Sequence, residues 1–210
     1  MKKDNKQEIA YQFIRNRILE GIYVQGQRLV IDTIGKELSL SSIPVREAIR
    51  RLEAEGMVTI KAYSGAIVST INENEYYEVL SSLAVLEGYA VSLSLPFYTE
   101  AQIKDLQNIN SQIAEALRQY NFLGYIQLNK EFHLLSIKNC PNKTMHALIE
   151  NMWNKLDTIR RLKPMYFPER AVEAINEHDA IIEMITKRSD PFEIEQFVRE
   201  HHVAAIKTGQ

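Results

Sequence analysis

The segment Ser41–Gly56, S-S-I-P-V-R-E-A-I-R-R-L-E-A-E-G, constrains the fold of this chain more than any other stretch. Its apolar residues between positions 45 and 52 recur at helical spacing and form one stripe, whereas Arg46 and Arg50 lie four residues apart on another face. One face can therefore pack on a core while the other contacts phosphates or bases. A solvated surface helix would show the same pattern, so the flanking sequence has to decide between the two interpretations.

The sequence before this segment predicts two more helices. Apolar residues repeat with helical period up to Gly21, where glycine favours a helix end, and a second short helix is predicted over residues 31–38. Only residues 39–41 separate it from the next helix, for which Ser42 is the expected N-cap and Pro44 lies in the first turn. Two short helices joined by so tight a turn are typical of a helix-turn-helix.

The sequence after Gly56 changes from a helical to an alternating period, in the runs V-T-I-K and A-I-V-S-T around A-Y-S-G. This pattern predicts a small hairpin, which after a helix-turn-helix would be a wing. In such a module the second helix of the helix-turn-helix, which here is the helix of the Ser41–Gly56 segment, enters the major groove. The N-terminal end of this helix binds phosphate, and its arginines hydrogen-bond guanine edges. The predicted DNA-contacting residues are Ser41, Ser42, Pro44, Val45, Arg46, Arg50, Tyr63, Ser64 and Gly65.

The distribution of charge indicates a domain boundary near residue 71. Residues 1–71 hold 11 Lys and Arg against 8 Asp and Glu, whereas residues 72–210 hold 14 against 19. We therefore expect a weakly basic DNA-binding domain over residues 1–71 and an acidic second domain over residues 72–210. Prolines divide the second part into six predicted helices: 72–94, 99–119, 121–138, 142–162, 168–187 and 191–207. Three pairs fit a helix cap followed three residues later by a side chain able to reach back: Asn72 with Glu75, Thr99 with Gln102, and Asp190 with Glu193. The predicted fold is mainly α, a winged helix-turn-helix followed by an all-α bundle.

The location of the protein is predicted from what the sequence lacks. No run approaches the roughly 20 apolar residues of a membrane helix, and the polar N-terminus leads into no apolar signal core. Cys140 is the single cysteine, so an internal disulfide or a thiolate metal site has no support. We expect a soluble, cytoplasmic protein with no membrane partner.

Four polar side chains of the second part form a candidate metal site. Asn129 and His133 are one helical turn apart in L-N-K-E-F-H-L-L, and His178 and His201 belong to the last two predicted helices. Imidazole is the commonest neutral metal ligand, and an i, i+4 pair can share one ion. Histidines of a structural core would be scattered in the same way, and spacing alone leaves both interpretations open.

The first part of the chain resembles the winged helix-turn-helix of the GntR family of bacterial transcription regulators. The resemblance rests on the string from Leu29 through P-V-R-E-A-I-R-R-L-E-A-E-G-M-V to S-G-A-I-V. This chain departs from the family pattern at Ser39, where Gly is usual, and at Ser42-Ile43, where Arg-Thr is usual. The resemblance implies binding to a double-stranded DNA operator of two-fold symmetry, with an altered choice of sequence.

The second part is similar to the ligand-binding FCD domain of the FadR branch, and its six helices to the VanR-like members. N-x-x-x-H, E-H-D-A-I-I and H-H-V follow one another in the expected order. The resemblance implies a divalent metal ion (Zn, Ni or Mn) and a small carboxylate effector. The implied metal ligands are Asn129, His133, His178 and His201, with His202 as the competing choice for the last.

Two departures bear on the implied effector site. Asn129 offers a neutral oxygen where the family has an acidic one, so a metal should be held more weakly. Leu83 stands where many relatives have an arginine, so the anion partners have to come from elsewhere. Arg160 and Arg161 are the candidates, although exposed arginines of a surface would look the same.

The leading hypothesis is a metabolite-responsive, homodimeric transcription repressor and not an enzyme. One alternative is a regulator whose second domain has lost sensing and serves only for dimerisation. The other is a metal-dependent all-α enzyme. The sequence opposes the enzyme because Glu131 points away from Asn129 and His133, and no nucleophile motif, Gly-rich phosphate loop or H-E-x-x-H occurs.

Overall fold

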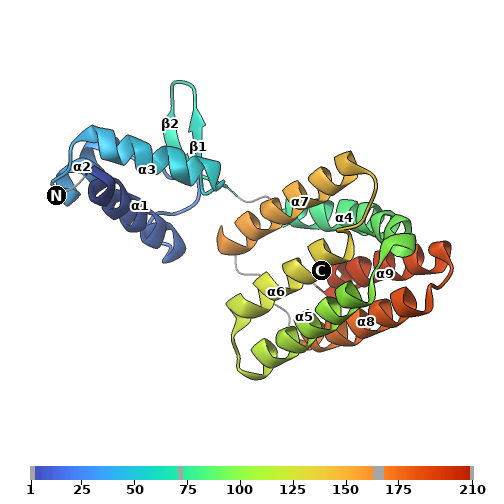
Figure 1. Ribbon diagram of the computed structural model, residues 1–210. Helices are drawn as coiled ribbons and strands as arrows, with labels where there is room; N and C mark the ends of the chain where they lie inside the picture. Colours follow the sequence, from blue (N-terminus) through green and yellow to red (C-terminus); the bar gives the residue numbers. More distant parts are fainter. Residues whose placement is uncertain (1–2, 71–72, 163–167, 209–210) are drawn as a thin grey trace. The chain divides into compact units, whose positions relative to one another are not determined.

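The computed structural model describes residues 3–70, 73–162 and 168–208, and Figure 1 shows helices connected by short loops, with one β-hairpin. The chain divides into two compact units. The first, here called the N-terminal unit, comprises Met1–Glu73 together with Lys155–Pro164. The second, called the helical unit, comprises Asn74–Asn154 and Met165–Gln210. The predicted mainly α fold is confirmed, whereas no sequence pattern indicated that residues 155–164 group with the N-terminal unit.

The N-terminal unit is a winged helix-turn-helix. Its elements are α1 (Lys3–Leu19), α2 (Ile31–Leu38), α3 (Ser42–Ala54), β1 (Val58–Lys61) and β2 (Gly65–Val68). The two strands are antiparallel, with Val58 opposite Val68 and Lys61 opposite Gly65. The apolar stripe of the opening segment is buried against α1 and the hairpin, and it includes Val45, Ala48, Ile49 and Leu52. Packing of this stripe fixes the orientation of α3, so the opposite face of the helix meets solvent.

The turn between α2 and α3 corrects one prediction. Ser41 is the N-cap of α3, in extended backbone, and Ser42 is already the first helical residue, so the prediction of Ser42 as N-cap was wrong by one residue. Pro44 thus occupies the third helical position and has no N–H for a serine hydroxyl to cap, and Ser41 makes no side-chain capping hydrogen bond. Gly35 keeps the turn tight, because a Cβ there would lie 2.9 Å from the Leu40 carbonyl oxygen.

The helices of the helical unit lie close to their predicted bounds. They are α4 (Glu73–Ser94), α5 (Glu100–Arg118), α6 (Phe122–Ser136), α7 (Lys143–Leu162), α8 (Pro168–Lys187) and α9 (Pro191–Thr208), with a 3-10 turn η1 at Leu95–Phe97. Thr99 and Gln102 form the expected capping box, and Asp190 accepts from the backbone N–H of Glu193. The predicted cap at Asn72 lies outside the described residues. Helix α5 packs between α6 and α8, and α8 packs on α9.

Helix α4 and η1 contain one stretch, Asn74–Phe97, that is long and apolar enough to cross a membrane by length and composition. The prediction that no run approaches the apolar length of a membrane helix is wrong by this criterion. Most of it, 61% of the apolar window, is buried inside the protein. Leu83 and Val91 are fully buried there, and Glu87, a charged residue, lies on the same buried side. These features are typical of a core helix, because a membrane span would place its apolar residues outward.

The contact between α4 and α9 gives a prediction about stability. A Cβ at Gly88 would lie 2.6 Å from the backbone oxygen of Glu195, and a backbone oxygen can move only if α9 moves. Overpacking costs about 1–3 kcal/mol, and the better helix propensity of alanine recovers about 1 kcal/mol. A clash with backbone lies toward the upper end of that cost, so Gly88→Ala should lower the free energy of unfolding by a net value of roughly 2 kcal/mol.

Thermal or urea unfolding of the full chain measures this effect. Ser81→Ala is the control, because Ser81 is an exposed residue of the same helix as Gly88 and the change adds no atoms against α9. We expect the control to have a clearly smaller effect than Gly88→Ala. Equal stability of wild type and Gly88→Ala would show that α4 and α9 can separate at little cost.

Candidate metal centre and DNA-binding surface

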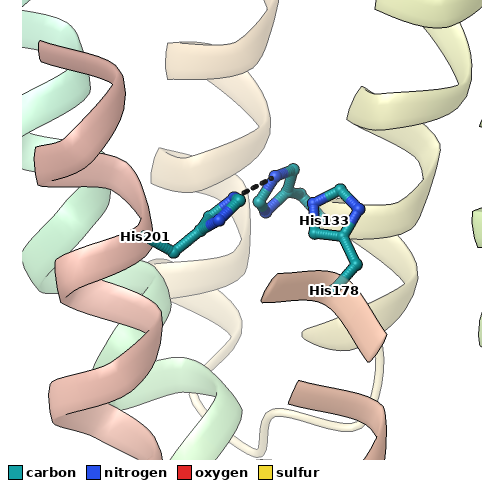
Figure 2. A group of neighbouring side chains, drawn as sticks. All are labelled: His133, His178 and His201. Carbon is teal, nitrogen blue, oxygen red and sulfur yellow. Dashed lines mark hydrogen bonds between the residues drawn. The ribbon is translucent and has the colours of Figure 1, made fainter. Parts of the chain in front are cut away.

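Three buried histidines from three helices meet in the helical unit. His133 comes from α6, His178 from α8 and His201 from α9, and one ring nitrogen of each lies within 4.8 Å of the others. Figure 2 shows the three rings turned toward one another, with the Nε2 atoms of His133 and His201 separated by 3.4 Å. The structure thus brings together residues that lie up to 68 positions apart in the sequence.

The other ring nitrogen of each histidine faces a hydrogen-bond acceptor. Nδ1 of His133 lies 2.9 Å from a carboxylate oxygen of Glu87, and Nδ1 of His178 lies 3.0 Å from the side-chain oxygen of Asn110. Nδ1 of His201 bonds to the carboxylate of Glu177. Since a carboxylate can only accept, His133 and His201 carry their protons on Nδ1. Their Nε2 lone pairs then point into the group.

The orientation of Asn110 assigns the same tautomer to His178. The amide nitrogen of Asn110 donates to the Ile175 carbonyl oxygen at 3.0 Å and to the carboxylate of Asp179 at 2.7 Å. The amide oxygen is therefore the atom that faces His178, whose Nδ1 must donate to it. In its neutral form each of the three histidines consequently offers an unprotonated Nε2, and outer partners that fix ring orientation in this way are typical of metal-binding histidines.

The donor set fits a divalent transition metal. Nε2 of His178 is buried and has no hydrogen-bond partner in the described structure, so it is an available lone pair. Two nitrogens each about 2.05 Å from a tetrahedral zinc ion lie roughly 3.3 Å apart, which agrees with the separation of 3.4 Å between His133 and His201. The ring of Phe132 stacks on His178 and limits its movement.

Burial controls the protonation of these groups. Burial lowers the pKa of His201 to about 3, although its hydrogen bond to Glu177 opposes the shift, and burial also lowers the pKa of His178 well below its ordinary value. Burial would raise the pKa of Glu87, but the adjacent His133 and His202 rings outweigh it and hold that pKa far below its ordinary value. Near neutral pH, His178 and His201 are therefore neutral ligands while Glu87 is charged.

These shifts predict that acid destabilises the metal-free protein. His178 and His201 bind protons in the unfolded chain near pH 6.5 but resist them in the folded chain. The unfolded state therefore gains protons first as the pH falls, and stability decreases from about pH 6.5 downward. The thermal midpoint of protein treated with a chelator should be lower at pH 5 than at pH 7.5. Replacing both histidines with glutamine should flatten this dependence, and a midpoint that is higher at pH 5 would contradict it.

The other residues predicted for the metal and effector sites do not belong to the group of three histidines. Asn129 is half-buried on α6, one turn before His133. Nε2 of His202 lies 2.8 Å from Glu87, so this ring belongs to a second buried group with Glu87 and His133. Arg160 belongs to the part of α7 that groups with the N-terminal unit, and the side chain of Arg161 lies outside the described residues.

The exposed face of α3 carries the predicted DNA contacts. Arg46 and Arg50 are exposed, and neither makes an ion pair within the described residues. Arg51 behaves differently, because it pairs with Glu8 at 2.8 Å and covers the ring of Tyr11 on α1. Arg46, Arg50 and Arg51 lie close together in the sequence. Of these three, only Arg46 and Arg50 have side chains that are available to an anion such as a DNA phosphate.

The remaining predicted DNA contacts divide by burial. Pro44 and Val45 are buried, so these two side chains hold α3 in place and cannot reach DNA as predicted. Ser41 is exposed and Ser42 half-buried at the start of α3, where backbone N–H groups also face outward. The hairpin tip carries the fully exposed Tyr63, together with Ser64 and Gly65. Both Tyr63 and Gly65 have positive φ, so the tip is a tight turn that presents the tyrosine ring to solvent.

Several polar residues of the site were not foreseen. Glu87 is the single carboxylate in the apolar run A-V-L-E-G-Y-A-V, and a buried charge in such a run is a signal that the sequence does contain. Asn110 on α5 differs, because it lies in the polar run K-D-L-Q-N-I-N-S-Q, where nothing marks it as buried. Glu177 precedes His178 directly, and Arg170 lies two helical turns before Glu177 on α8. Their roles depend on which helices become neighbours.

Two family models match the chain. The model described as FCD domain matches residues 78–205, and the model described as bacterial regulatory proteins, gntR family, matches residues 6–68. The first range covers all four predicted metal ligands, and the second covers α2, α3 and the hairpin.

Relatives and solved structures agree with these matches. The uncharacterized HTH-type transcriptional regulator YdhC of Bacillus subtilis is 25% identical over 85% of this chain and 80% of its own length. The gluconate operon transcriptional repressor of the same organism is 26% identical over 84% of this chain and 74% of its own length. Among structures, Escherichia coli McbR/YncC superposes with a TM-score of 0.66 at 19% identity, covering 96% of this chain and 95% of that chain.

A second structure, described by the words "Lar controls the expression of the Listeria monocytogenes agr system and mediates virulence", has a TM-score of 0.77 at 15% identity. It covers 97% of this chain and 95% of that chain. The two structural matches extend over both units, so the order of a winged helix-turn-helix followed by a helical bundle is shared.

Proposed function

Because the chain belongs to the gntR family of bacterial regulatory proteins and carries an FCD domain, we propose that it is a homodimeric repressor that a small carboxylate releases from DNA. It is a DNA-binding transcription regulator and not an enzyme. The observation that carries the sensing proposal is the group of three buried histidines whose Nε2 lone pairs converge. The protein is expected to act in the cytoplasm, where its DNA lies.

The proposed metal site uses His133, His178 and His201, with Asn129 as a candidate fourth ligand. A bound divalent ion would supply positive charge that attracts an effector carboxylate. The protein's own residues supply the rest, because Glu87, Asn110 and Glu177 hold the rings in the required tautomers. Neutral imidazoles bring no charge to the ion, and the carboxylates of Glu87 and Glu177 contact the rings and not the ion, which favours an anion bound directly to the metal.

Exposed apolar residues on the helical unit support the proposed dimer. Val85 and Tyr89 lie one turn apart on α4, and they are 49% and 45% exposed, while Phe97 of η1 is 54% exposed. Large apolar side chains that recur along one helix face favour burial against a second copy. Family members bind operators as dimers, and a dimer provides two copies of α3 for a two-fold symmetric operator.

The proposed repressor action depends on thermodynamic linkage between carboxylate binding and operator binding. A carboxylate that prefers the DNA-free arrangement of the dimer lowers operator affinity by the same factor by which DNA lowers carboxylate affinity. The similarity to the gluconate operon repressor supports both the negative sign of control and an organic acid as signal. The competing possibility is a helical unit that only dimerises, and the buried Leu83 in place of an arginine is the observation that favours it.

Fluorescence anisotropy tests the proposal with a DNA site selected by the protein from a random library. The zinc-loaded protein is titrated with this site in the absence and presence of organic acids, including gluconate and other hydroxy acids. We expect one class of acid to weaken binding at least tenfold, whereas chelation of the metal should remove the response. DNA binding that no acid changes would support the dimerisation-only alternative.

A further inference from the structure

The exposed face of α3 carries an isoleucine in line with two arginines. Ile43, Arg46 and Arg50 are spaced i, i+3 and i+7, so the three side chains lie on one face of the helix. The apolar residues that alternate with them are buried on the opposite face, and this burial fixes the rotation of α3. Ile43 is 59% exposed, and it is therefore presented to the same surroundings as the two arginines.

Ile43 has no role in the packing of the N-terminal unit. Among the described residues of this unit, it belongs neither to the buried core nor to the partly buried apolar side chains that pack against the core. A β-branched residue also has a lower helix propensity than alanine, so the helix itself gains nothing from it. Single exposed apolar residues are common on protein surfaces, but this one lies on the helix that enters DNA. The side chain is therefore available to a base.

The position of Ile43 within α3 places it near the base pairs. It is the second residue of the helix, and the N-terminal residues of a recognition helix contact base edges in the major groove. From Ile43 to Arg46 an α-helix rises about 4.5 Å, which is close to the roughly 3.4 Å between successive base pairs. The two side chains can thus face neighbouring base pairs at the same time.

The chemistry of isoleucine selects one group on the DNA. The side chain has neither a donor nor an acceptor, so it cannot hydrogen-bond a phosphate or a base edge. The major groove presents one apolar group, the 5-methyl group of thymine, and apolar side chains contact it. At the edges of the other bases, isoleucine would cover polar atoms without replacing their hydrogen bonds to water. Thymine is therefore the base that this side chain fits.

We propose that Ile43 is a specificity-determining residue that recognises the 5-methyl group of a thymine, next to the base pair that Arg46 contacts. Its stiffness favours this role, because a β-branched residue in a helix has one strongly preferred χ1 rotamer and loses little freedom on contact. The proposal rests on DNA binding by the gntR-family module and not on metal binding, carboxylate sensing or repression. It gives physical content to the altered choice of DNA sequence that the departure at Ser42-Ile43 implies.

Uracil substitution tests the proposal, because deoxyuridine lacks the 5-methyl group of thymidine and keeps its base pairing. The full wild-type chain selects a DNA site from a random library, and each thymine of the site is then replaced in turn, in both half-sites together. Fluorescence anisotropy measures the affinity. We expect a position at which uracil weakens wild-type binding about threefold to fivefold per half-site, the value of one buried methyl group, and hence roughly 10- to 25-fold in total.

Ile43→Ala separates a contact by this side chain from an effect of the methyl group on DNA shape. The variant should bind the thymine site about tenfold more weakly than wild type, and uracil at the sensitive position should change its affinity at most about threefold. Ile60→Ala is the matched control, because Ile60 is also exposed, at 45%, but lies on β1. This control should keep the full uracil effect, whatever its own affinity for the site.

A more conservative variant covers the case in which Ile43→Ala unfolds at a lower temperature than wild type. Ile43→Val keeps the branched side chain and removes only its outermost methyl group. It should show a uracil effect that is smaller than that of wild type and larger than that of Ile43→Ala. A uracil effect of wild-type size in Ile43→Val and Ile43→Ala alike would exclude the contact.

Two outcomes would overturn the assignment. In the first, uracil weakens wild type and Ile43→Ala by the same factor, so the methyl group acts through DNA shape or through another residue. In the second, the selected site contains no thymine at which uracil matters. Selection of the site keeps this proposal apart from DNA recognition itself. If no site can be selected, sequence-specific binding fails and the assignment fails with it, whereas a selected site with no dependence on Ile43 contradicts only the assignment.

Discussion

Replacement of Arg46 with alanine is expected to abolish operator-specific DNA binding while the fold and the dimer persist. Arg46 is exposed on α3 and makes no ion pair within the described ranges, so its removal leaves no buried partner behind. A good bidentate contact between arginine and guanine contributes about 1–3 kcal/mol of discrimination. A two-fold operator contains two half-sites, so a dimer loses this contribution at each of them. The total loss of discriminating binding free energy is roughly 2–6 kcal/mol.

The measurement compares a selected DNA site with an unrelated duplex of the same length. Arg46→Ala should reduce affinity for the selected site to nearly that of the unrelated duplex. Binding of wild type to both should weaken steeply with added salt, because phosphate contacts release counterions. A flat salt response would contradict DNA recognition by this unit as a whole.

Arg51→Gln provides the matched control. This substitution removes the same charge from the same helix, but Arg51 faces α1, where it pairs with Glu8 and covers Tyr11. We expect it to lower stability slightly and to change specificity little, because surface ion pairs contribute about 1 kcal/mol or less. If both variants retain the wild-type footprint, Arg46 does not read bases, and the half-buried Ser42 and the exposed Arg50 become the remaining predicted contacts on α3.

Structural features that depend on residues close together in the sequence were predicted well. Helix bounds depend on residues a few positions apart. The Thr99 and Gln102 pair and the prolines that begin α8 and α9 therefore predicted them well. The hairpin depends on one short turn, and its presence was predicted for the same reason, whereas its register is known only from the structure. Even so, α3 begins at Ser42, one residue before the predicted start, and its N-cap Ser41 makes no side-chain capping hydrogen bond.

The partners of the histidines could not be predicted in this way. Glu87 reaches His133 only because α4 packs beside α6, and Asn110 reaches His178 only because α5 packs beside α8. Neighbouring residues such as His201 and His202 point about 100° apart on a helix, so spacing cannot choose between them until the rotation of α9 is known. The structure places His201 with the three-histidine group and gives His202 to Glu87.

The proposed metal centre leads to the second large effect. Replacement of His178 with alanine is expected to lower the affinity for zinc at least 100-fold, because even outer partners of metal ligands are worth 10–100-fold. His178 is the best single target, since its buried Nε2 has no other partner in the described structure. His146→Ala on α7 is the control, because that histidine belongs to neither buried group.

The reporter is built into the chain. Trp153 is the only tryptophan, its indole N–H donates to Glu87, and its ring stacks on His133 at 4.8 Å between centroids. Nickel or cobalt bound at the three histidines should quench its fluorescence. The titration should saturate at one ion per chain in wild type and in His146→Ala, and it should not saturate at micromolar metal in His178→Ala.

Thermal unfolding gives an independent measure of the same loss. At a metal concentration 1,000 times the dissociation constant, binding stabilises the folded chain by about 4 kcal/mol, and a 100-fold weaker site retains only about 1.4 kcal/mol. For a chain of this length the difference corresponds to a fall of roughly 5–10 °C in the metal-induced rise of the midpoint. The comparison is made between metal-loaded and metal-free forms of each variant, so the cavity left by alanine cancels. An equal rise in wild type and His178→Ala would place the ion elsewhere, whereas no rise in wild type would mean that the three histidines serve only to pack the core.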